Sequence, residues 1–456
     1  SAFAGVDLEL FNYDMVLYAS PFYGGNDGVS GSNGFVDEEL TVAYEIYNGS
    51  STTENVDTTL KYHYGVRGKS IEVDMSASHT EMVDVPSFWT KGLVRNVDTD
   101  TDYYKIQHAI DNASAGDTLN VWAWTYYETL DVDRRVNIVG NGTGNTTLDG
   151  QSSAGDVIYI TENDVTIKSL KIINGASDSI WTVFDDITLE NIVVHNSGGW
   201  GIYAQASADL EILNSVVSSS DSGGIYTGTS TQIKDSNIID NNYYGIYVAG
   251  TYNNVENSTV SGTTCSGSCS THGYGIYVSA PGDSVFIYNN TISNNSYSGI
   301  YADGSTSSKY INNKVVDNEG YGIDLDYYWG GNSASVINNQ ILRNEKSGLY
   351  FSSVDVNKIE NNIIKNNGEY GIVFSGSVQN YLWNNTISLN EDLDIVLVLS
   401  SNNNYAINTV FSTISVDSDS SLILTEYPST IRLFTNPSLR KKSIISISSP
   451  FLSTTI

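Results

Sequence analysis

Residues 243–248, with the sequence YYGIYV, contain the tripeptide Gly-Ile-Tyr that decides the fold of this chain. The tripeptide or a variant of it recurs every 21 to 30 residues. Eleven aliphatic positions from Ile158 to Ile395 follow this register, at spacings of 22, 22, 23, 21, 30, 24, 23, 26, 23 and 23 residues. Such a period predicts one turn of a parallel β-helix, because each turn can bury its apolar face only against neighbouring turns. The copies are Gly201-Ile202-Tyr203, Gly224-Ile225-Tyr226, Gly245-Ile246-Tyr247, Gly275-Ile276-Tyr277, Gly299-Ile300-Tyr301, Gly322-Ile323-Asp324, Gly348-Leu349-Tyr350 and Gly371-Ile372-Val373.

A second periodic position holds Asn or Asp and runs in phase with the first. We expect the aliphatic positions to form ladders inside the coil, about 4.8 Å apart from turn to turn. The Asn positions are expected to stack at a turn, where a side-chain amide can satisfy the backbone of a neighbouring coil. A leucine-rich repeat would need its own consensus, and a propeller blade a period of about 40 residues, so both are excluded. The Asn positions are Asn191, Asn214, Asp235, Asn257, Asn289, Asn312, Asn338, Asn361 and Asn384.

These repeats resemble the right-handed parallel β-helix repeats of the NosD-like and pectin-lyase-like superfamily, as residues 243–248 and 311–316 illustrate. Residues 106–113 have helical spacing and lead into residues 116–142, which matches the capping helix and first coils of that superfamily. The resemblance covers about residues 103–400 and implies an all-β, right-handed parallel β-helix of about 12 coils. It implies little about function, because the superfamily includes lyases, hydrolases, epimerases, adhesins and surface-layer proteins.

The two ends of the chain do not follow the repeat. Residues 1–95 contain alternating segments and resemble a CARDB-like, immunoglobulin-type β-sandwich. Residues 96–103 are expected to be an acidic linker, and residues 104–400 the β-helix with its N-terminal capping helix. Residues 401–456 are expected to form a C-terminal β-type tail or partial module, and the last thirty residues carry a net charge of +4.

The charge balance restricts the partners of the chain. Its 456 residues include 52 acids and 21 bases, giving a formal net charge of −31. Nucleic acids and anionic membrane surfaces attract Lys and Arg, so neither is an expected partner. Since no apolar run reaches about 18 residues, membrane insertion is not expected either. The composition predicts an extracellular or cell-surface protein.

Cysteines and glycosylation sequons support export. Cys265 and Cys269 lie in the one long repeat and predict a small loop closed by a disulfide, with two free thiols as the alternative. The N-x-S/T sequons are candidates for glycosylation, although an Asn-rich chain also produces them by chance. They lie at Asn48, Asn112, Asn141, Asn145, Asn257, Asn289, Asn294 and Asn384.

Metal binding is expected at one place at most. The aspartates Asp98, Asp100 and Asp102 have the alternating spacing that can bring several oxygens around calcium, although an EF-hand's later Gly and Glu are missing. The other reading is a polar linker without a metal. The name NosD suggests copper, but three Met and five scattered His do not support a copper site. No cofactor is predicted other than this structural calcium.

A stripe of tyrosines should run along one outer side of the coil, because the residue after each inward Ile points outward. One reading is aromatic stacking that stabilises the coil. The other is a flat platform for a glycan or another subunit. The stripe comprises Tyr203, Tyr226, Tyr247, Tyr277, Tyr301 and Tyr350.

No complete catalytic signature is present, so our leading prediction is a non-enzymatic protein. It would be a self-assembling surface-layer, sheath or filament subunit, or an adhesin, built on the rigid coil. The alternative is a carbohydrate-active enzyme, a polysaccharide lyase or hydrolase, that uses Asp324 and Asp326, which share one face of a strand. A second alternative is a glycan-binding adhesin that uses the tyrosine stripe.

Overall fold

A computed structural model of the chain describes residues 94–152, 155–265, 272–279, 282–326 and 333–424 with their side chains. It also describes the strand backbones of residues 6–12, 58–64, 67–73, 432–433, 444–448 and 453–455. The chain divides into two compact units, Ser1–Ala109 and Ile110–Ile456.

The first unit contains two antiparallel pieces within its described residues. The strands β1 (Val6–Asn12), β2 (Thr58–Tyr64) and β3 (Arg67–Val73) form a three-stranded sheet. Most of the sandwich expected over residues 1–95 lies outside the described residues, so the sandwich stays a prediction. The predicted linker is part of a hairpin of β4 (Val94–Asn96) and β5 (Thr101–Tyr103). The short helix α1 (Ile106–Asp111) forms where helical spacing predicted it.

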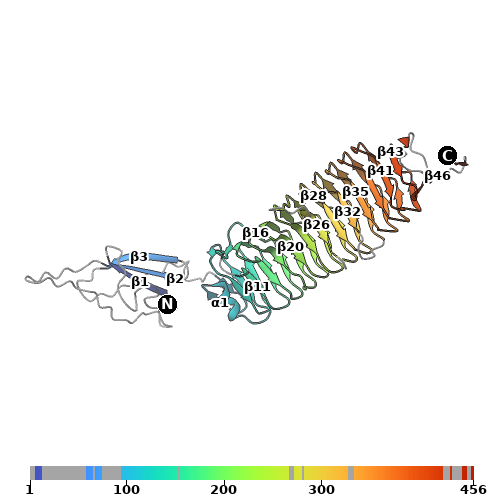
Figure 1. Ribbon diagram of the computed structural model, residues 1–456. Coiled ribbons are helices and arrows are strands. Elements are labelled where there is room, and N and C mark those ends of the chain that lie inside the picture. Colours follow the sequence, from blue (N-terminus) through green and yellow to red (C-terminus); the bar gives the residue numbers. More distant parts are fainter. Residues whose placement is uncertain are drawn as a thin grey trace, which may run out of the picture. The chain divides into compact units, whose positions relative to one another are not determined.

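The second unit is a parallel β-helix, in which three strands of each coil join three different sheets (Figure 1). Sheet I consists of β6 (Thr118–Val121), β9 (Asn137–Gly140), β12 (Thr166–Lys168), β15 (Thr188–Glu190), β18 (Glu211–Leu213), β21 (Gln232–Lys234), β24 (Asn254–Glu256), β27 (Phe286–Tyr288), β30 (Lys309–Ile311), β33 (Ser335–Ile337), β36 (Lys358–Glu360), β39 (Tyr381–Trp383), β42 (Asn404–Ile407), β44 (Ser421–Leu424) and β46 (Ile444–Ser448).

Sheet II consists of β7 (Thr125–Tyr126), β10 (Thr147–Asp149), β13 (Lys171–Gly175), β16 (Val193–Ser197), β19 (Val216–Ser220), β22 (Asn237–Ile239), β25 (Thr259–Ser261), β28 (Thr291–Ser293), β31 (Lys314–Val316), β34 (Gln340–Leu342), β37 (Ile363–Lys365) and β40 (Thr386–Ser388). Sheet III consists of β8 (Leu130–Val132), β11 (Ile158–Ile160), β14 (Ile180–Thr182), β17 (Trp200–Tyr203), β20 (Gly223–Thr227), β23 (Tyr244–Val248), β26 (Tyr274–Val278), β29 (Ile300–Asp303), β32 (Ile323–Asp326), β35 (Leu349–Ser352), β38 (Ile372–Ser375), β41 (Ile395–Val398), β43 (Thr413–Val416) and β45 (Arg432–Leu433).

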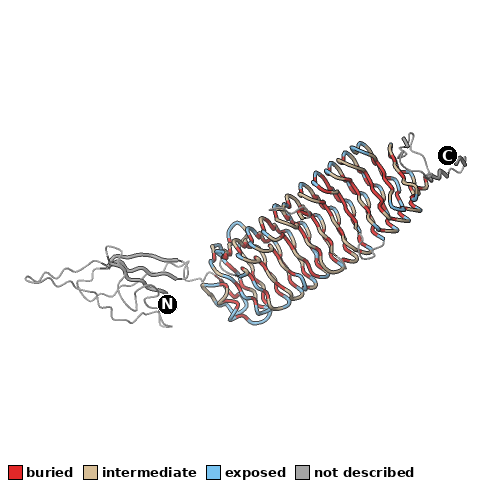
Figure 2. The backbone as a smooth tube through the Cα atoms, in the orientation of Figure 1, coloured by how far each residue is buried: buried red, intermediate tan, exposed pale blue. Residues whose placement is uncertain are grey.

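The predicted aliphatic ladder lies on sheet III. All eleven positions from Ile158 to Ile395 pair in register with their neighbours, and each side chain is fully buried. Buried residues form a continuous inner line through every coil, with exposed residues on the outer side (Figure 2). In the eight Gly-Ile-Tyr copies the glycine before the aliphatic residue allows close approach: a Cβ on Gly245 would lie 2.5 Å from the carbonyl oxygen of Gly275. The repeat therefore fixes both the core and the spacing of the coils.

The predicted Asn positions lie at the corner between sheets I and II, but their role differs from the prediction. All nine are exposed and left-handed, with φ between 50° and 58°, a conformation that Asn and Asp tolerate better than most residues. From Ser215 onward, the next residue in each coil is a Ser or Asn that points inward and accepts a hydrogen bond from the backbone of the preceding coil. Asn313 N, for example, donates to Asn339 Oδ1 at 2.8 Å, and Asn339 Nδ2 donates to the carbonyl of Tyr310 at 2.8 Å.

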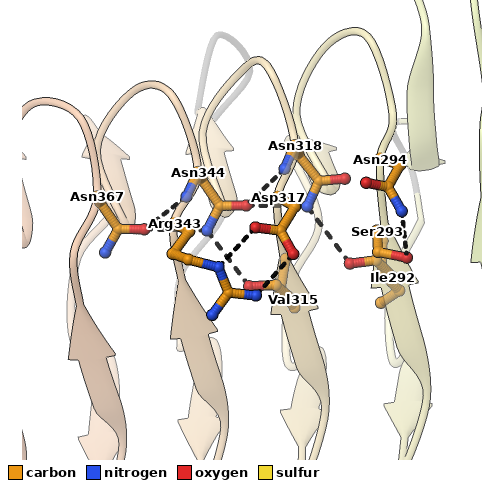
Figure 3. Close-up of polar contacts among 9 residues, drawn as sticks. All are labelled: Ile292, Ser293, Asn294, Val315, Asp317, Asn318, Arg343, Asn344 and Asn367. Atoms are coloured by element: carbon orange, nitrogen blue, oxygen red, sulfur yellow. Dashed lines mark hydrogen bonds and ion pairs between the residues drawn. The ribbon is translucent and has the colours of Figure 1, made fainter.

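The same arrangement recurs at the corner between sheets II and III (Figure 3). Asn318, Asn344 and Asn367 bond side chain to side chain across successive coils, at 2.9 and 3.0 Å. The exposed position before Asn344 holds Arg343, which makes two hydrogen bonds of 2.7 Å with Asp317. We call these inward stacks the asparagine ladders.

The coil also continues past the predicted boundary at residue 400. β41 pairs in parallel with β43, and β42 pairs in parallel with β44. Further on, β45 and β46 extend sheets III and I, and β47 (Ser453–Thr455) turns back antiparallel to β46. The predicted tail therefore begins as more of the β-helix, because residues 404–424 keep the alternation of buried and outward positions.

Candidate functional site

The outward position of sheet III carries a row of aromatic side chains in register. It runs through Tyr159, Trp181, Tyr203, Tyr226, Tyr247, Tyr277 and Tyr301, and it includes Tyr350 two coils beyond Tyr301. We call it the aromatic row. The structure brings all six predicted stripe residues onto this line, and it adds Tyr159 and Trp181. Between Tyr301 and Tyr350 the same position holds Asp324.

The rings of the aromatic row pack against each other. The centroids of Tyr226 and Tyr247 are 4.6 Å apart at an interplanar angle of 18°, and those of Tyr247 and Tyr277 are 4.9 Å apart at 16°. Stacked rings of this kind stabilise neighbouring coils. Because the faces are occupied by other rings, the row presents ring edges and phenol hydroxyls outward. It therefore differs from the flat platform of our second reading.

A second set of aromatic residues lies beside the row, and sequence reasoning missed it. Tyr244 and Tyr274 immediately precede the Gly-Ile-Tyr copies, and Trp200 lies over Gly223, where an added Cβ would be 2.2 Å from the indole. Tyr274 contacts Tyr301 with centroids 5.1 Å apart. The signal was an aromatic residue directly before the glycine, which recurs in these coils and again at Tyr321.

Three carboxylates meet at the end of this aromatic surface. Asp324 and Asp326 lie two residues apart on β32 and on the same face, as predicted. Asp303 on β29 is the register partner of Asp326, and Tyr301 is that of Asp324. We call Asp303, Asp324 and Asp326 the acid cluster. Sequence reasoning missed Asp303, although its position three residues after Ile300 equals that of Asp326 after Ile323.

Asp324 is the most unusual member of the acid cluster. Its side chain is buried, with 6% of the residue exposed, and its Oδ1 atom has no hydrogen-bond partner. Burial raises the pKa of Asp324 well above 3.8, the charge of Asp326 raises it further, and Lys346 partly offsets the rise. Asp324 is therefore a carboxyl group that favours its protonated form.

Asp303 and the neighbouring phenols are shifted in the same direction. Burial and the charge of Asp326 raise the pKa of Asp303, whose Oδ1 atom is also buried without a partner. Burial and nearby acids raise the pKa of Tyr277 and of Tyr301 above the ordinary value, and farther along the row burial raises the pKa of Tyr226 to about 12. The phenols around the acid cluster are consequently neutral hydrogen-bond donors across the physiological range.

Lys346 is the basic side chain that acts on Asp324. Its ammonium lies 5.1 Å from the ring centroid of Tyr297 and 5.0 Å from that of Tyr321. Both distances fall within the range of cation–π attraction. Lys346 therefore lowers the pKa of Asp324 while its ammonium rests on aromatic faces.

A separate polar groove of about 580 Å³ lies over sheet I of the first coils. Its lining includes Asn137, Glu211 and Gln232, and Arg135 there pairs with Asp164 at 3.2 Å. None of its carboxylate oxygens is buried without a partner. The groove belongs to a different sheet from the acid cluster and contributes nothing to it.

The predicted calcium residues lie in the turn between β4 and β5. Arg95 binds Asp102 at 3.1 Å and also contacts Asp100, so a guanidinium competes for the carboxylates expected to hold the metal. Within the part of the chain that the structure describes, no group of three His, Cys, Asp or Glu side chains is arranged to hold a metal ion. Calcium binding at Asp98, Asp100 and Asp102 stays a prediction.

The disulfide and the sequons are placed as follows. Cys265 is disulfide-bonded, in agreement with the predicted pair, while Cys269 lies outside the described residues. Asn48 lies outside them as well. The other seven sequon asparagines are exposed, so their side chains are accessible, and their glycosylation stays a prediction.

Comparison with known proteins identifies the family. Two families match the chain: "Right handed beta helix region" over residues 268–411, and "Periplasmic copper-binding protein (NosD)" over residues 110–335. Together with the coil described above, these matches show that the chain belongs to the right-handed parallel β-helix superfamily. No curated protein sequence is similar to it. The periplasmic description of NosD and the disulfide both indicate a location outside the cytoplasm.

Copper binding, which the NosD description names, does not fit the residues of this chain. The described residues offer no grouping of three His, Cys, Asp or Glu ligands, and the whole sequence contains five His and three Met. We therefore derive no function from copper. Among the described residues, no helix is long and apolar enough to cross a membrane.

Several solved structures share the fold. The A-module of a mannuronan C-5 epimerase from Azotobacter vinelandii is 15% identical over 76% of this chain and 95% of that chain, with a TM-score of 0.49. The catalytic domain of Agl-KA is 13% identical over 86% of this chain and 74% of that chain, with a TM-score of 0.44. Pectate lyase Pel9A is 11% identical over 52% of this chain and 71% of that chain, with a TM-score of 0.37. At these identities the likeness shows the fold alone.

These comparisons correct our leading prediction. The predicted non-enzymatic role, a surface-layer, sheath or filament subunit or an adhesin, is contradicted, because the similar structures include proteins named as epimerases, a pectate lyase and a glucanase. Self-association of the chain stays a prediction, and most of the basic residues 427–456 lie outside the described residues. Glycan binding has to be argued from the site itself.

Proposed function

We propose that this protein is a carbohydrate-active enzyme that cleaves a glycosidic bond at the acid cluster of sheet III. The observation that carries the proposal is Asp324, a buried carboxyl with an unpartnered oxygen and a raised pKa, beside a second carboxylate on the same strand. Glycoside cleavage needs this combination of a protonated acid and a nearby carboxylate.

The two carboxyl groups take different roles. Asp324 donates its proton to the glycosidic oxygen, because burial raises its pKa and favours the protonated form. Asp326 acts as the carboxylate that attacks the sugar or activates water. Residues two apart on a strand are about 6.6 Å apart, and neighbouring strands are about 4.8 Å apart. Both separations are compatible with the carboxyl pairs of glycosidases, about 5 to 9.5 Å.

The aromatic row would align the polymer with the acid cluster. Its phenol edges repeat once per coil, at about 4.8 Å, so they offer regularly spaced hydrogen-bond donors to a linear chain of sugars. Because the pKa of Tyr226 is raised to about 12, these donors stay protonated. A polysaccharide lying parallel to the coil axis would meet the row first and Asp324 at the row's interruption.

Hydrolysis suits the site better than β-elimination. Elimination needs a uronate carboxylate to be neutralised and a base to remove the neighbouring proton. The acid cluster repels a uronate, and the nearby base, Lys346, already has its ammonium over Tyr297 and Tyr321. We further propose that the enzyme acts outside the cell or at its surface, where polysaccharides are accessible.

The test is release of reducing ends from a panel of neutral, amino-sugar and uronate polysaccharides. Asp324→Asn and Asp326→Asn should each lower kcat by about 10²- to 10⁴-fold. Wild-type activity should fall as the pH rises through the raised pKa of Asp324, because the proton donor is lost. The matched control is Asp131→Asn, at the same outward position of sheet III on β8. Cleavage that survives both cluster substitutions would refute the assignment, and binding without cleavage would favour the glycan-binding adhesin.

A further inference from the structure

Two buried oxygens in the acid cluster lack a donor. They are Oδ1 of Asp303 and Oδ1 of Asp324, neither of which has a hydrogen-bond partner. An acceptor left unsatisfied in this way is costly, and more so when it carries charge. The fold supplies this pair of acceptors and leaves them available to a ligand that brings donors.

The charge around these oxygens is negative. Asp326 raises the pKa of both Asp303 and Asp324 through its own charge. Lys346 acts on Asp324, but its ammonium lies over the rings of Tyr297 and Tyr321. The missing donor is therefore expected to carry positive charge.

The surrounding rings suit an ammonium group. The acid cluster adjoins Tyr277 and Tyr301, whose pKa values are raised by burial and further by the charge of Asp303. Lys346 already demonstrates that tyrosine faces beside this site accept an ammonium, at 5.0 and 5.1 Å. Carboxylates combined with aromatic rings recognise cationic amines through charge and cation–π attraction together.

We propose that the acid cluster is a subsite for the ammonium group of an amino sugar, and that Asp303 selects polysaccharides with free amino groups over uncharged and uronate polymers. The proposal deepens the proposed function and rests on it for its kinetic consequence, although the binding itself can be measured without turnover. The net charge of −31 acts in the same direction, since it attracts a polycation over a long range.

The experiment uses Asp324→Asn protein, in which turnover should be blocked. Asn resembles the protonated carboxyl that burial favours at Asp324, and the substitution leaves the carboxyl groups of Asp303 and Asp326 in place. Binding of chitosan hexamer and of the fully N-acetylated chitin hexamer is measured by calorimetry, since the amino groups of the first are free and cationic and those of the second are acetylated and uncharged. Methyl-esterified and de-esterified polygalacturonate provide the corresponding uncharged and anionic pair.

We expect chitosan hexamer to bind at least about tenfold more tightly than chitin hexamer, and de-esterified polygalacturonate to bind worst. Adding Asp303→Asn should bring the chitosan-to-chitin ratio close to one, whereas adding Asp131→Asn should leave it unchanged. Equal binding of both hexamers, no binding of either, or a preference for polygalacturonate would overturn the inference. Chitosan binding by wild-type protein that releases no reducing ends would instead refute the proposed hydrolysis and leave the subsite standing.

Discussion

The asparagine ladders and the acid cluster both place polar side chains in buried positions. The ladders complete their hydrogen bonds, whereas the acid cluster leaves two oxygens without a partner. In the ladders, Asn339 accepts from Asn313 and donates to Tyr310 and Asn362. In the acid cluster, Asp303 and Asp324 each leave an oxygen without a partner. The difference teaches that polar burial in this coil is stabilising where neighbouring coils complete each other's bonds. Where neighbouring coils leave a buried acceptor unsatisfied, the free-energy cost of burying it is offset only when a ligand supplies the donor.

The amide and carboxyl side chains explain this contrast. An Asn side chain both donates and accepts, so identical residues in successive coils can bond to one another without end. Ionised carboxylates only accept, and they repel each other. A stack of Asp would therefore fail where a stack of Asn succeeds. The acid cluster is confined to two adjacent strands, β29 and β32, as this argument requires.

The largest effect on stability should come from breaking a ladder. Asn339→Ala removes the acceptor of Asn313 N, which is then buried without that acceptor, and it removes the side-chain bonds to the Tyr310 carbonyl and to Asn362. The orphaned N–H costs about 1–3 kcal/mol and each further lost bond about 0.5–1.5 kcal/mol, so the free energy of unfolding should fall by about 2–5 kcal/mol. Urea denaturation followed by circular dichroism measures it. The control is Asn338→Gly, an exposed left-handed neighbour, which should change little.

A loss at Asn339 no larger than that at Asn338 would mean that the ladder contributes little to stability. The acid cluster would then differ from the ladders only in its charge. Its unsatisfied hydrogen bonds would no longer be an argument that a ligand binds there.

The substitution Asp324→Asn should act in the opposite direction. The pKa of Asp324 is raised in the folded chain above 3.8, so the stability it contributes is complete below that pH and is lost as the pH rises through the folded value. An Asn resembles the protonated carboxyl and does not ionise. The variant should therefore match wild type near pH 4 and exceed it by about 1–3 kcal/mol at pH 8.

Urea unfolding of both proteins at the two pH values measures this difference, with Asp131→Asn as the exposed control. A variant that is less stable than wild type at pH 8 would show that ionised Asp324 is satisfied in the fold. That result would remove the main support for a ligand at the cluster.

Much of this architecture could be predicted from the sequence, because the repeat itself records the coil. The spacing of Ile158 to Ile395 gave the ladder, and the Gly-Ile-Tyr copies gave the line of tyrosines. Asp324 could also have been placed in that line, since it replaces Tyr in the copy at residues 322–324. The Asn role was misplaced by one residue, because the exposed left-handed position is as periodic as the inward position beside it.

The rest of the site depends on contacts between coils that a period cannot encode. Lys346 reaches Tyr297 and Tyr321 from a different coil, across corners of unequal length. Burial of the Asp324 oxygen depends on the rings packed around it, which no spacing reveals. Arg95 was likewise missed as the partner of Asp100 and Asp102, because the hairpin that joins them was read as a linker.

The smallest effect should come from the exposed ion pair beside a ladder (Figure 3). Arg343 makes two hydrogen bonds of 2.7 Å with Asp317, yet both side chains face solvent, with 52% and 39% exposed. Arg343→Asn keeps a residue that tolerates left-handed φ, and Asn occupies the equivalent corner position at Asn294 and Asn366. Exposed pairs contribute about 0–1 kcal/mol, so the free energy of unfolding should change by no more than that amount, and by less at high salt.

Asn344→Ala, at the next residue, removes inward hydrogen bonds to Val315 and Asn367, so it should lower the free energy of unfolding several times more. If Arg343→Asn and Asn344→Ala lower the free energy of unfolding by the same amount, the buried hydrogen bonds of the ladders stabilise the coil no more than an exposed ion pair does.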